Sequence, residues 1–441
     1  MRNRRKLLRE VRLRTVDNLR RIAGTSGPVS AEGSNPRARD RAAADPLRRF
    51  WTLHPAKRPA SGLLTGLKGS RNAVLPVARP SLPPLERYVA LLEQIWDTRL
   101  LSNFGTFAQL FEARAQAYLG NPFVRCTASC DLGLVVSVAA LGLPDGAACL
   151  VPSFTFNSTI NAVLWNRLRP VFVDCDPVTF NIDVRDVRRR LGAVAPAAII
   201  ATHVFGSPLD LDALLKAARE AGARVVVDAA HAFGSVYRGR RIGAAGLGDF
   251  QVFSFSGTKQ VTSAEGGLVA AGGLEDVERI EKLRAYGFRW NYVSEVVGLN
   301  AKLSELHAAL GTLLVGDVED VVSRRNAIAA RYRAGLSDIG DMAFQAELPE
   351  TRSTFKDFGI LCPARRDELS AHLGQLGIQT KKYFRPLHGM PAYARFRSAD
   401  DDLVDTEAVY SRILCLPIFN ELGDGDVDRV CEVIRNFYGV R

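Results

Sequence analysis

Short apolar runs recur along the chain from residue 123 onward, each bounded by polar or turn-forming residues. They lie in segments 123–127, 149–152, 170–177, 197–206, 224–231, 250–256 and 267–273. Runs of this length, rich in β-branched and aromatic residues, predict buried strands. Segments of helical character separate several of them, and strands that alternate with helices usually form a largely parallel sheet. The pattern therefore predicts an α/β layer.

Helical periodicity is expected on both sides of this layer. Ahead of it, apolar residues recur at helical spacing in two groups, first Tyr88, Leu91, Leu92, Ile95 and Trp96, and then Leu110, Phe111 and Ala115. Behind it, residues 272–330 are mainly helical, a strand is expected in 354–362, and the chain ends in a helix over 427–438. These last elements are numerous enough for a second domain. We expect a large domain at 76–325 and a smaller C-terminal α/β domain at 326–441.

Residues 1–75 have a different pattern and are expected to form an extension. Apolar residues stand at helical spacing among arginines at Leu8, Val11, Thr15, Leu19 and Ile22. This arrangement favours a basic amphipathic helix, which could contact an acidic surface, a membrane face or RNA. Residues 24–40 are rich in Gly, Pro and Ser, as is typical of a disordered linker. We expect no catalytic role for the extension.

The positive charge of the chain belongs to that extension. Residues 1–60 contain 16 Lys and Arg against 5 Asp and Glu, an excess equal to the net charge of +11 of the whole chain. The remaining residues are therefore neutral overall. A basic isoelectric point of this origin does not indicate a nucleic-acid-binding body, and we expect no specific nucleic-acid partner.

Composition excludes several classes of protein. Hydrophobic content of 47% and charged content of 24% match an ordinary globular protein. No apolar run approaches the roughly 20 residues of a membrane span, and the N-terminus lacks the apolar core of a secretory signal. Seven cysteines lie far apart, and the closest pair, Cys126 and Cys130, lacks zinc-type spacing. We expect a cytoplasmic, reducing compartment and no metal.

Candidate chemistry lies in the stretch 225–267. One apolar run delivers Asp228 at its carboxyl end, and a second delivers Ser254 and then Lys259 on a short turn. In parallel sheets, ligands bind at the carboxyl ends of strands, so these side chains could converge. Pyridoxal phosphate (PLP) requires a lysine that bonds to its aldehyde carbon and an acid that keeps its ring nitrogen protonated. Asp228 and Lys259 match these needs, although a helix cap and a solvated surface lysine are the simpler interpretations of each alone.

Two further features could complete a cofactor site. The strand ending at Thr127 opens into an apolar helix, and the free N–H groups at such a helix N-terminus bind phosphate. Phe156 follows another strand, where its ring could cover one face of a planar cofactor. Core packing is an equally good interpretation of Phe156 from the sequence alone.

The order and spacing of seven motifs resemble those of a known family. The motifs are PSFTF, FVDCDP, HVFGSPLDLD, VVVDAAHAFGS, FSFSGTK, EGG and GLNAKLSELHAALG. They look like those of the DegT/DnrJ/EryC1/StrS sugar aminotransferases over residues 76–441. The resemblance implies the aspartate aminotransferase-like (type I) PLP-transferase fold, with a large, mostly parallel sheet domain and a smaller C-terminal domain. It also implies amination, with glutamate as donor, of a nucleotide-linked keto-sugar similar to a dTDP-4-keto-6-deoxyhexose.

The resemblance implies roles for the residues around the cofactor ring. Lys259 would bond covalently to the cofactor and later move the proton between substrate and cofactor. Asp228 would bind the pyridine nitrogen, and His231 would stand near the ring hydroxyl, where the family often has Gln. Phe156 would stack on the ring.

Other roles concern the phosphate and the substrate. The resemblance implies that Ser254 bonds the phosphate and that Asn300 reaches it from the other subunit of a homodimer. Tyr383 and His388 fall in a segment that often lies near the sugar nucleotide in the family.

One segment departs from the family pattern. Where the family has an Asn/Ser-Gly-Thr phosphate loop, this chain has Ser129, Cys130 and Asp131. A carboxylate beside a phosphate dianion is unfavourable unless it turns away, for instance toward the helix N-terminus. Backbone N–H groups together with Thr127 or Ser129 would then hold the phosphate.

Two other functions fit parts of the sequence. A PLP-dependent sugar dehydratase has the same fold, but the related deoxygenating enzymes replace the lysine with His, and this chain keeps Lys259. A PLP-fold regulatory or binding protein, tethered by its basic extension, is a second alternative. The intact pair of Asp228 and Lys259 argues against it.

Overall fold

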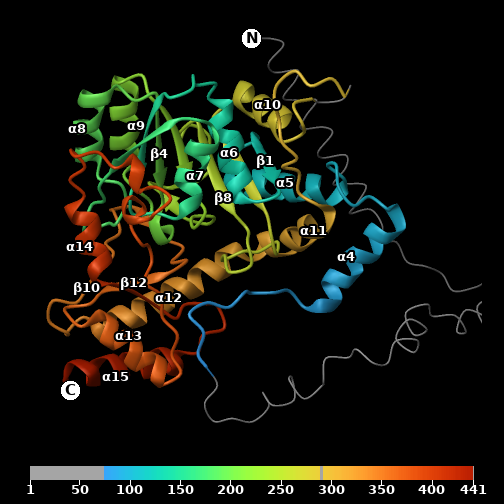
Figure 1. Cartoon of the computed structure of the whole chain (residues 1–441). Helices are drawn as coiled ribbons and strands as arrows, with labels where there is room; N and C mark the ends of the chain where they lie inside the picture. The colour runs from blue at the N-terminus through green and yellow to red at the C-terminus, as the bar shows by residue number, and fades with distance from the viewer. Residues whose placement is uncertain (1–73, 289–291, 441) are drawn as a thin grey trace, which may run out of the picture. The chain divides into compact units, whose positions relative to one another are not determined.

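The computed structural model describes residues 74–288 and 292–440 (Figure 1). The basic helix and linker expected before residue 74 lie outside the described residues. Within the described part, no helix is both long and apolar enough to cross a membrane.

A seven-stranded sheet forms the centre of the larger part of the fold. Its strands, in spatial order, are β1 (Val124–Thr127), β9 (Gly267–Ala271), β8 (Phe250–Ser254), β5 (Arg224–Asp228), β4 (Ala198–Thr202), β2 (Ala148–Pro152) and β3 (Arg169–Val173). The five strands from β8 to β3 are parallel, whereas β9 runs antiparallel to both β8 and β1. The predicted strands and the mostly parallel α/β sheet are thus confirmed.

Helices cover both faces of this sheet, which explains why its strands are apolar without alternation. Figure 1 shows the sheet between the two layers. In β5, Val225 and Val227 belong to one core cluster, whereas Val226 belongs to the other. The first cluster includes α5 (Thr106–Leu119), α8 (Val184–Val194), α9 (Leu211–Glu220) and α11 (Glu305–Leu314). The second includes α6 (Cys130–Ala140), α7 (Asn157–Trp165) and α10 (Leu274–Leu283).

The chain after residue 315 builds a second, smaller layer. An antiparallel sheet of β10 (Ala343–Phe344), β12 (Phe358–Leu361) and β13 (Ile413–Leu416) has its own apolar core. Its helices are α12 (Val318–Leu336), α13 (Arg366–Gln375), α14 (Val404–Arg412) and α15 (Asp424–Tyr438). The predicted strand and terminal helix are confirmed as β12 and α15. The expected boundary at 325 falls inside α12, which continues through it without a break.

Short elements connect the two layers. A small sheet pairs β11 (Thr351–Arg352) with β6 (Val236–Tyr237), which pairs with β7 (Arg240–Arg241). Single turns of 3-10 helix are η4 (Val204–Gly206), η5 (Val315–Asp317), η6 (Leu387–Gly389) and η7 (Ala394–Phe396). Leu75 forms a bridge with Ile378, so the first described residues pack on the C-terminal layer.

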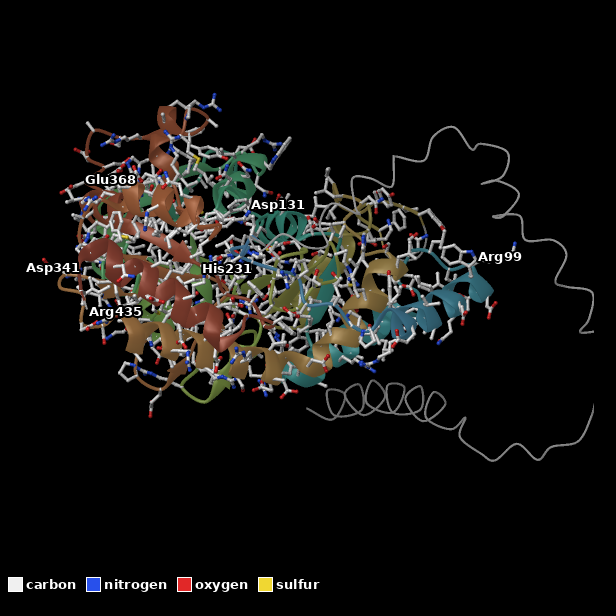
Figure 2. The ribbon with its side chains drawn as sticks, turned by 90° about the horizontal axis from the view of Figure 1, so that it is seen from below. Arg99, Asp131, His231, Asp341, Glu368 and Arg435 are labelled. Carbon is white, nitrogen blue, oxygen red and sulfur yellow. The ribbon has the colours of Figure 1, made fainter. Side chains whose placement is uncertain are left out.

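The first described helix, α4 (Leu85–Thr98), confirms the predicted periodicity with one exception. Tyr88, Leu91 and Ile95 pack on the core, but Trp96 is exposed. Arg99, in a left-handed conformation, ends the helix. In Figure 2, Arg99 and Asp341 lie at the outside of the described part, whereas His231 lies in its interior.

Candidate active site

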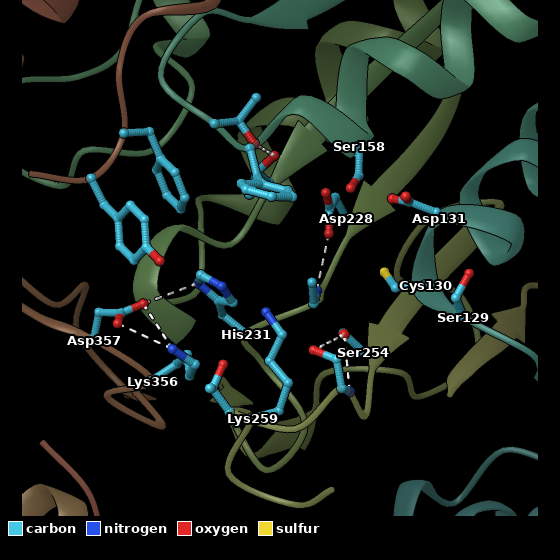
Figure 3. Close-up of a pocket in the computed structure, with 18 of the residues that line it drawn as sticks. Ser129, Cys130, Asp131, Ser158, Asp228, His231, Ser254, Lys259, Lys356 and Asp357 are labelled. Carbon is cyan, nitrogen blue, oxygen red and sulfur yellow. Dashed lines mark hydrogen bonds and ion pairs between the residues drawn. The ribbon is translucent and has the colours of Figure 1, made fainter. Parts of the chain in front are cut away.

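A cavity of about 280 Å³ opens where β4, β5 and β8 end (Figure 3). Thr202, Asp228 and Ser254 are the last residues of these strands, and all three line it. The strands are parallel, and Asp228 pairs with Thr202 on one side and Val252 on the other. The polar ends of separate strands therefore meet at one edge of the sheet, as predicted.

Asp228 is buried and held by two hydrogen bonds. The Thr159 hydroxyl donates to Oδ2 over 2.7 Å, and the Ala230 N–H donates to Oδ1 over 3.1 Å. Behind Thr159, a chain of hydroxyl contacts of 2.9 Å runs through Thr155 to Thr202. Burial raises the pKa of Asp228, and the bond from Thr159 opposes this rise. The carboxylate is thus fixed in a dry setting that favours a cationic partner.

Lys259 follows β8 on a turn, where its N–H donates to the Ser256 carbonyl over 3.0 Å. Its side chain enters the cavity from the side of β8 (Figure 3). Burial, and then the nearby charge of Lys356, lower the pKa of Lys259 to about 8. The lowered pKa raises the share of neutral amine near neutral pH, and nucleophilic attack and proton transfer both require that neutral form.

His231 lines the same cavity and is neutral. Burial, and then the charges of Lys259 and Lys356, lower its pKa well below the usual value. Thr354 and Gln260 both donate to its backbone carbonyl. Its Nδ1 lies 4.0 Å from Asp357 Oδ2 and is buried without a hydrogen bond among the described residues.

Lys356 and Asp357 also line the cavity, although the sequence did not predict a role for either residue. Both are buried, and Lys356 Nζ donates to the two Asp357 oxygens over 3.1 and 3.2 Å. They come just before β12, in the C-terminal layer, and line the cavity together with Lys259. The sequence shows a lysine and an aspartate side by side directly before an apolar strand. An exposed ion pair would have the same sequence, so this pattern alone could not show that the two residues line a cavity.

The N-terminus of α6 forms another part of the cavity wall. Ser129 caps the helix, and its Oγ accepts from the Leu132 N–H over 3.2 Å. The Gly133 N–H bonds to the Ser129 carbonyl. Because the first N–H groups of a helix have no partner within it, those of Cys130 and Asp131 are left for a ligand; no contact of the described residues fills them.

Gly267 brings this helix end close to the sheet. A Cβ at Gly267 would lie 2.6 Å from both Thr127 Oγ1 and the Ser129 carbonyl oxygen, so a larger residue would push α6 away. Thr127 Oγ1 also donates to that carbonyl over 2.9 Å. The second glycine of the EGG motif thus sets the position of the helix N-terminus.

The two unusual residues of this segment differ in their setting. Cys130 is buried, and burial raises the pKa of its thiol well above the usual value, so the thiol is protonated. Asp131 is exposed and lines the cavity. Figure 3 shows its carboxylate directed toward Ser158, at the start of α7. It lies close enough to Asp228 to raise the pKa of that residue.

Phe156 precedes α7 and lines the cavity with half of its surface exposed. Its ring centroid lies 6.4 Å from that of Phe384, at 60°. The interpretation as a core residue is therefore wrong, and one face of the ring is free to cover a planar ligand.

The remaining predicted residues lie in three different settings. Tyr383 lines the cavity, and its hydroxyl accepts from Lys381 over 3.0 Å. His388 is buried outside the lining, between Ser153 Oγ at 2.7 Å and Glu407 at 2.9 Å. Asn300 is exposed, is not among the residues that line the cavity of its own chain, and accepts from Lys302 over 2.7 Å.

The cavity thus holds groups that match each part of PLP. A buried carboxylate suits the pyridine nitrogen, a lysine of lowered pKa suits the aldehyde, and a ring face suits stacking. Ser129, Ser254 and the free N–H groups of α6 suit the phosphate. The carboxylate of Asp131 opposes that group.

Comparisons with known proteins agree with this geometry. A model of the DegT/DnrJ/EryC1/StrS aminotransferase family matches residues 85–435. The chain is 30% identical over 368 residues to dTDP-4-amino-4,6-dideoxy-D-glucose transaminase of Escherichia coli, covering 82% of this chain and 98% of that protein. It is 32% identical over 364 residues to GDP-perosamine synthase of Caulobacter vibrioides, covering 80% and 95%. The solved structure of DesI in the presence of its TDP-sugar product matches with a TM-score of 0.77 and 31% identity, covering 85% and 96%.

Proposed function

This chain belongs to the DegT/DnrJ/EryC1/StrS aminotransferase family, and we propose that it transfers an amino group from glutamate to a dTDP-4-keto-6-deoxyhexose. It is a PLP-dependent aminotransferase that acts on nucleotide sugars. The observation that carries the proposal is the meeting of buried Asp228 and partly buried Lys259 in one cavity. The similarity to a dTDP-sugar transaminase and to DesI supports a dTDP-sugar, and the comparable similarity to GDP-perosamine synthase makes a GDP-sugar the alternative to test.

PLP, when bound, supplies an electron sink for the carbon that gains or loses the amino group. Asp228 would bind the pyridine nitrogen and keep it protonated. Thr159 and Ala230 hold the carboxylate in place through two hydrogen bonds, so it needs no rearrangement on binding. A charge-assisted hydrogen bond of this kind contributes roughly 1.5–3 kcal/mol.

Lys259 would bond to the cofactor and then move the proton at the reacting carbon. A pKa of about 8 places its Nζ near the solution pH, where it can both accept and return a proton. Its short turn after β8 brings the amine into the same cavity as Asp228. The catalytic base and the ring anchor are therefore supplied by neighbouring strands.

The phosphate would be held by the N-terminus of α6 and by the hydroxyls of Ser129 and Ser254. Free N–H groups and the helix dipole both favour an anion there. Phe156 would stack on the ring, and the neutral imidazole of His231 would approach the ring hydroxyl. Cys130 would contribute its backbone N–H, because its thiol is protonated and buried.

A homodimer would complete the site through Asn300 of the second subunit. Large apolar side chains are exposed on α4 and in the segment before Asn300, including Trp96, Tyr292 and Val297. Large apolar residues exposed in this way favour a protein interface. Asn300 is exposed and does not line its own cavity, which supports a role across that interface.

The proposed reaction is tested by its two half-reactions. Purified protein should be yellow from bound PLP, and L-glutamate alone should convert it to the pyridoxamine form and bleach that colour. A panel of nucleotide-linked 4-keto-sugars is then added and the aminated product identified by mass. A dTDP substrate should be used in preference to its GDP counterpart. Lys259→Ala should abolish both steps, and turnover of a GDP-sugar alone would refute the dTDP assignment.

A further inference from the structure

The charged residues that line the cavity are mostly acidic, which disfavours the binding of an anionic substrate. The charged lining residues are Asp131, Asp228, Glu265 and Asp357 on the acidic side and Lys259 and Lys356 on the basic side. An amino acid donor carries a carboxylate next to the carbon that loses nitrogen. In a site with an excess of acids, that carboxylate needs a local cation. Lys259 is committed to the chemistry, which leaves Lys356.

Lys356 is a buried cation on the cavity wall. Its side chain is 5% exposed, and both of its hydrogen bonds among the described residues go to the carboxylate of Asp357. A lysine ammonium has three N–H donors, so one partner leaves it with capacity for another acceptor. A buried ion pair contributes little net stability compared with an apolar pair, so stability alone does not account for this pair on the cavity wall.

Lys356 also lies at the right end of the cavity. Figure 3 shows Lys356 and Asp357 on the opposite side of Lys259 from Ser129 and Asp131. The helix N-terminus that suits the phosphate is thus at one end, and Lys356 is at the other. Lys356 lies close enough to the reacting amine for its charge to lower the pKa of Lys259.

The backbone fixes Lys356 in this position. Its N–H donates to the Phe205 carbonyl over 2.9 Å, and its own carbonyl accepts from buried Arg325 over 3.3 Å. These contacts join the segment before β12 to the loop after β4 and to α12. A cation held in this way is preorganised for an anion.

We infer that Lys356, held by Asp357, binds the carboxylate of the amino acid donor next to its reacting carbon. This inference rests on the proposed aminotransferase function. Asp357 stabilises the ammonium charge before the donor binds, and the donor carboxylate then becomes a second hydrogen-bond acceptor for Lys356. Lys356 therefore serves the half-reaction with the donor and not the binding of PLP.

Four variants test this assignment. Lys356→Gln removes the cation but leaves Asp357 buried without its partner, so Lys356→Gln/Asp357→Asn removes the pair together. Lys356→Arg keeps the charge. Lys382→Gln is the matched control, because Lys382 is an exposed lysine of the same layer that pairs with Asp367 outside the cavity.

Two measurements report on the donor. The first is the KM of L-glutamate in the half-reaction of PLP-loaded protein. The second is the Kd of 2-oxoglutarate for the same form by calorimetry, which involves no turnover. Both should rise about 10- to 100-fold in Lys356→Gln and in the double variant, the range expected for loss of one charge-assisted hydrogen bond. Lys356→Arg should recover most of the affinity, and Lys382→Gln should match wild type.

The loss should be confined to the donor. The affinity for PLP should stay within about threefold of wild type in every variant, since Lys356 is placed away from the phosphate and the ring nitrogen. 4-Aminobutanoate, which is glutamate without that carboxylate, should react equally poorly with wild type and the double variant.

Unchanged KM and Kd in the double variant would overturn the inference and leave the pair a structural one, even if the melting temperature fell. A wild-type protein that binds PLP but reacts with no amino acid would instead refute the proposed function. The two failures are therefore distinguishable.

Discussion

Replacing Lys259 should stabilise the protein when its cofactor has been removed. The pKa of Lys259 is lowered from 10.5 to about 8, mainly by burial. The folded protein therefore bears the free-energy cost of holding a partly desolvated ammonium whenever that group is protonated. With 1.36 kcal/mol for each pKa unit, the lowering corresponds to about 3 kcal/mol. Lys259→Met keeps the length of the side chain and removes this cost.

The pH dependence of the effect follows from the two pKa values. Below pH 8 the ammonium is present in both states, so the folded protein bears the full cost and the variant has its largest advantage. Between pH 8 and 10.5 the folded protein has lost the proton and the unfolded chain keeps it, so wild type gains stability as pH rises. Above pH 10.5 the amine is neutral in both states and the advantage is gone.

Urea unfolding of the two cofactor-free proteins measures the difference. It should be about 2–3 kcal/mol at pH 7 and should shrink steadily at pH 9 and 10. Comparing the variants at each pH removes the contribution of all other titrating groups. An advantage of equal size at pH 7 and pH 10 would show that packing, not the charge of Lys259, is responsible.

Three further predictions concern the cofactor and the dimer. Asp228→Asn should weaken PLP binding about 10- to 100-fold, because it removes the charged partner of the ring nitrogen, and fluorescence quenching by added PLP measures the Kd. Asp131→Asn should strengthen PLP binding about fivefold, because it removes a repulsion of about 1 kcal/mol between an exposed carboxylate and the phosphate, and the gain should fade at high salt. A mixture of inactive Asn300→Ala and inactive Lys259→Ala proteins should recover activity after subunit exchange, because hybrid dimers contain one site with both native residues.

Each of these predictions has a clear opposing result. Equal PLP affinity of Asp228→Asn and wild type would remove Asp228 from the ring. Weaker binding by Asp131→Asn would mean that Asp131 contributes a contact rather than a repulsion. Mixed variants that stay inactive, in a preparation shown to exchange subunits, would place Asn300 outside the partner site.

Much of the sheet was predictable because its strands are buried on both faces. A continuous apolar run such as 225–227 predicts a strand buried on both faces, and a polar residue directly after its carboxyl end, such as Asp228, is easily recognised. Asp228, Ser254 and Lys259 were found for that reason. The direction of the strands was not available in the same way: β9 has the same apolar pattern as the parallel strands, yet it runs antiparallel to both β1 and β8.

Residues brought in from the C-terminal layer were harder to predict. Lys356 and Asp357 reach the cavity only because the chain crosses from α12 to β12 beside the loop after β4. The spacing of residues in the local sequence does not indicate this crossing. Trp96 shows the opposite case, since its helical spacing suggested a buried position, whereas it is exposed. Periodicity gives the face of a helix but not the residue at which that face leaves the core.

The change of the visible spectrum on addition of L-glutamate tests the central claim most directly. Purified wild-type protein with bound PLP is mixed with L-glutamate in the absence of any sugar, and the absorbance is followed through a single turnover. The yellow colour should disappear in wild type and return when a dTDP-4-keto-6-deoxyhexose is added. A wild-type spectrum that glutamate leaves unchanged, or a Lys259→Ala protein that responds in the same way, would contradict the claim.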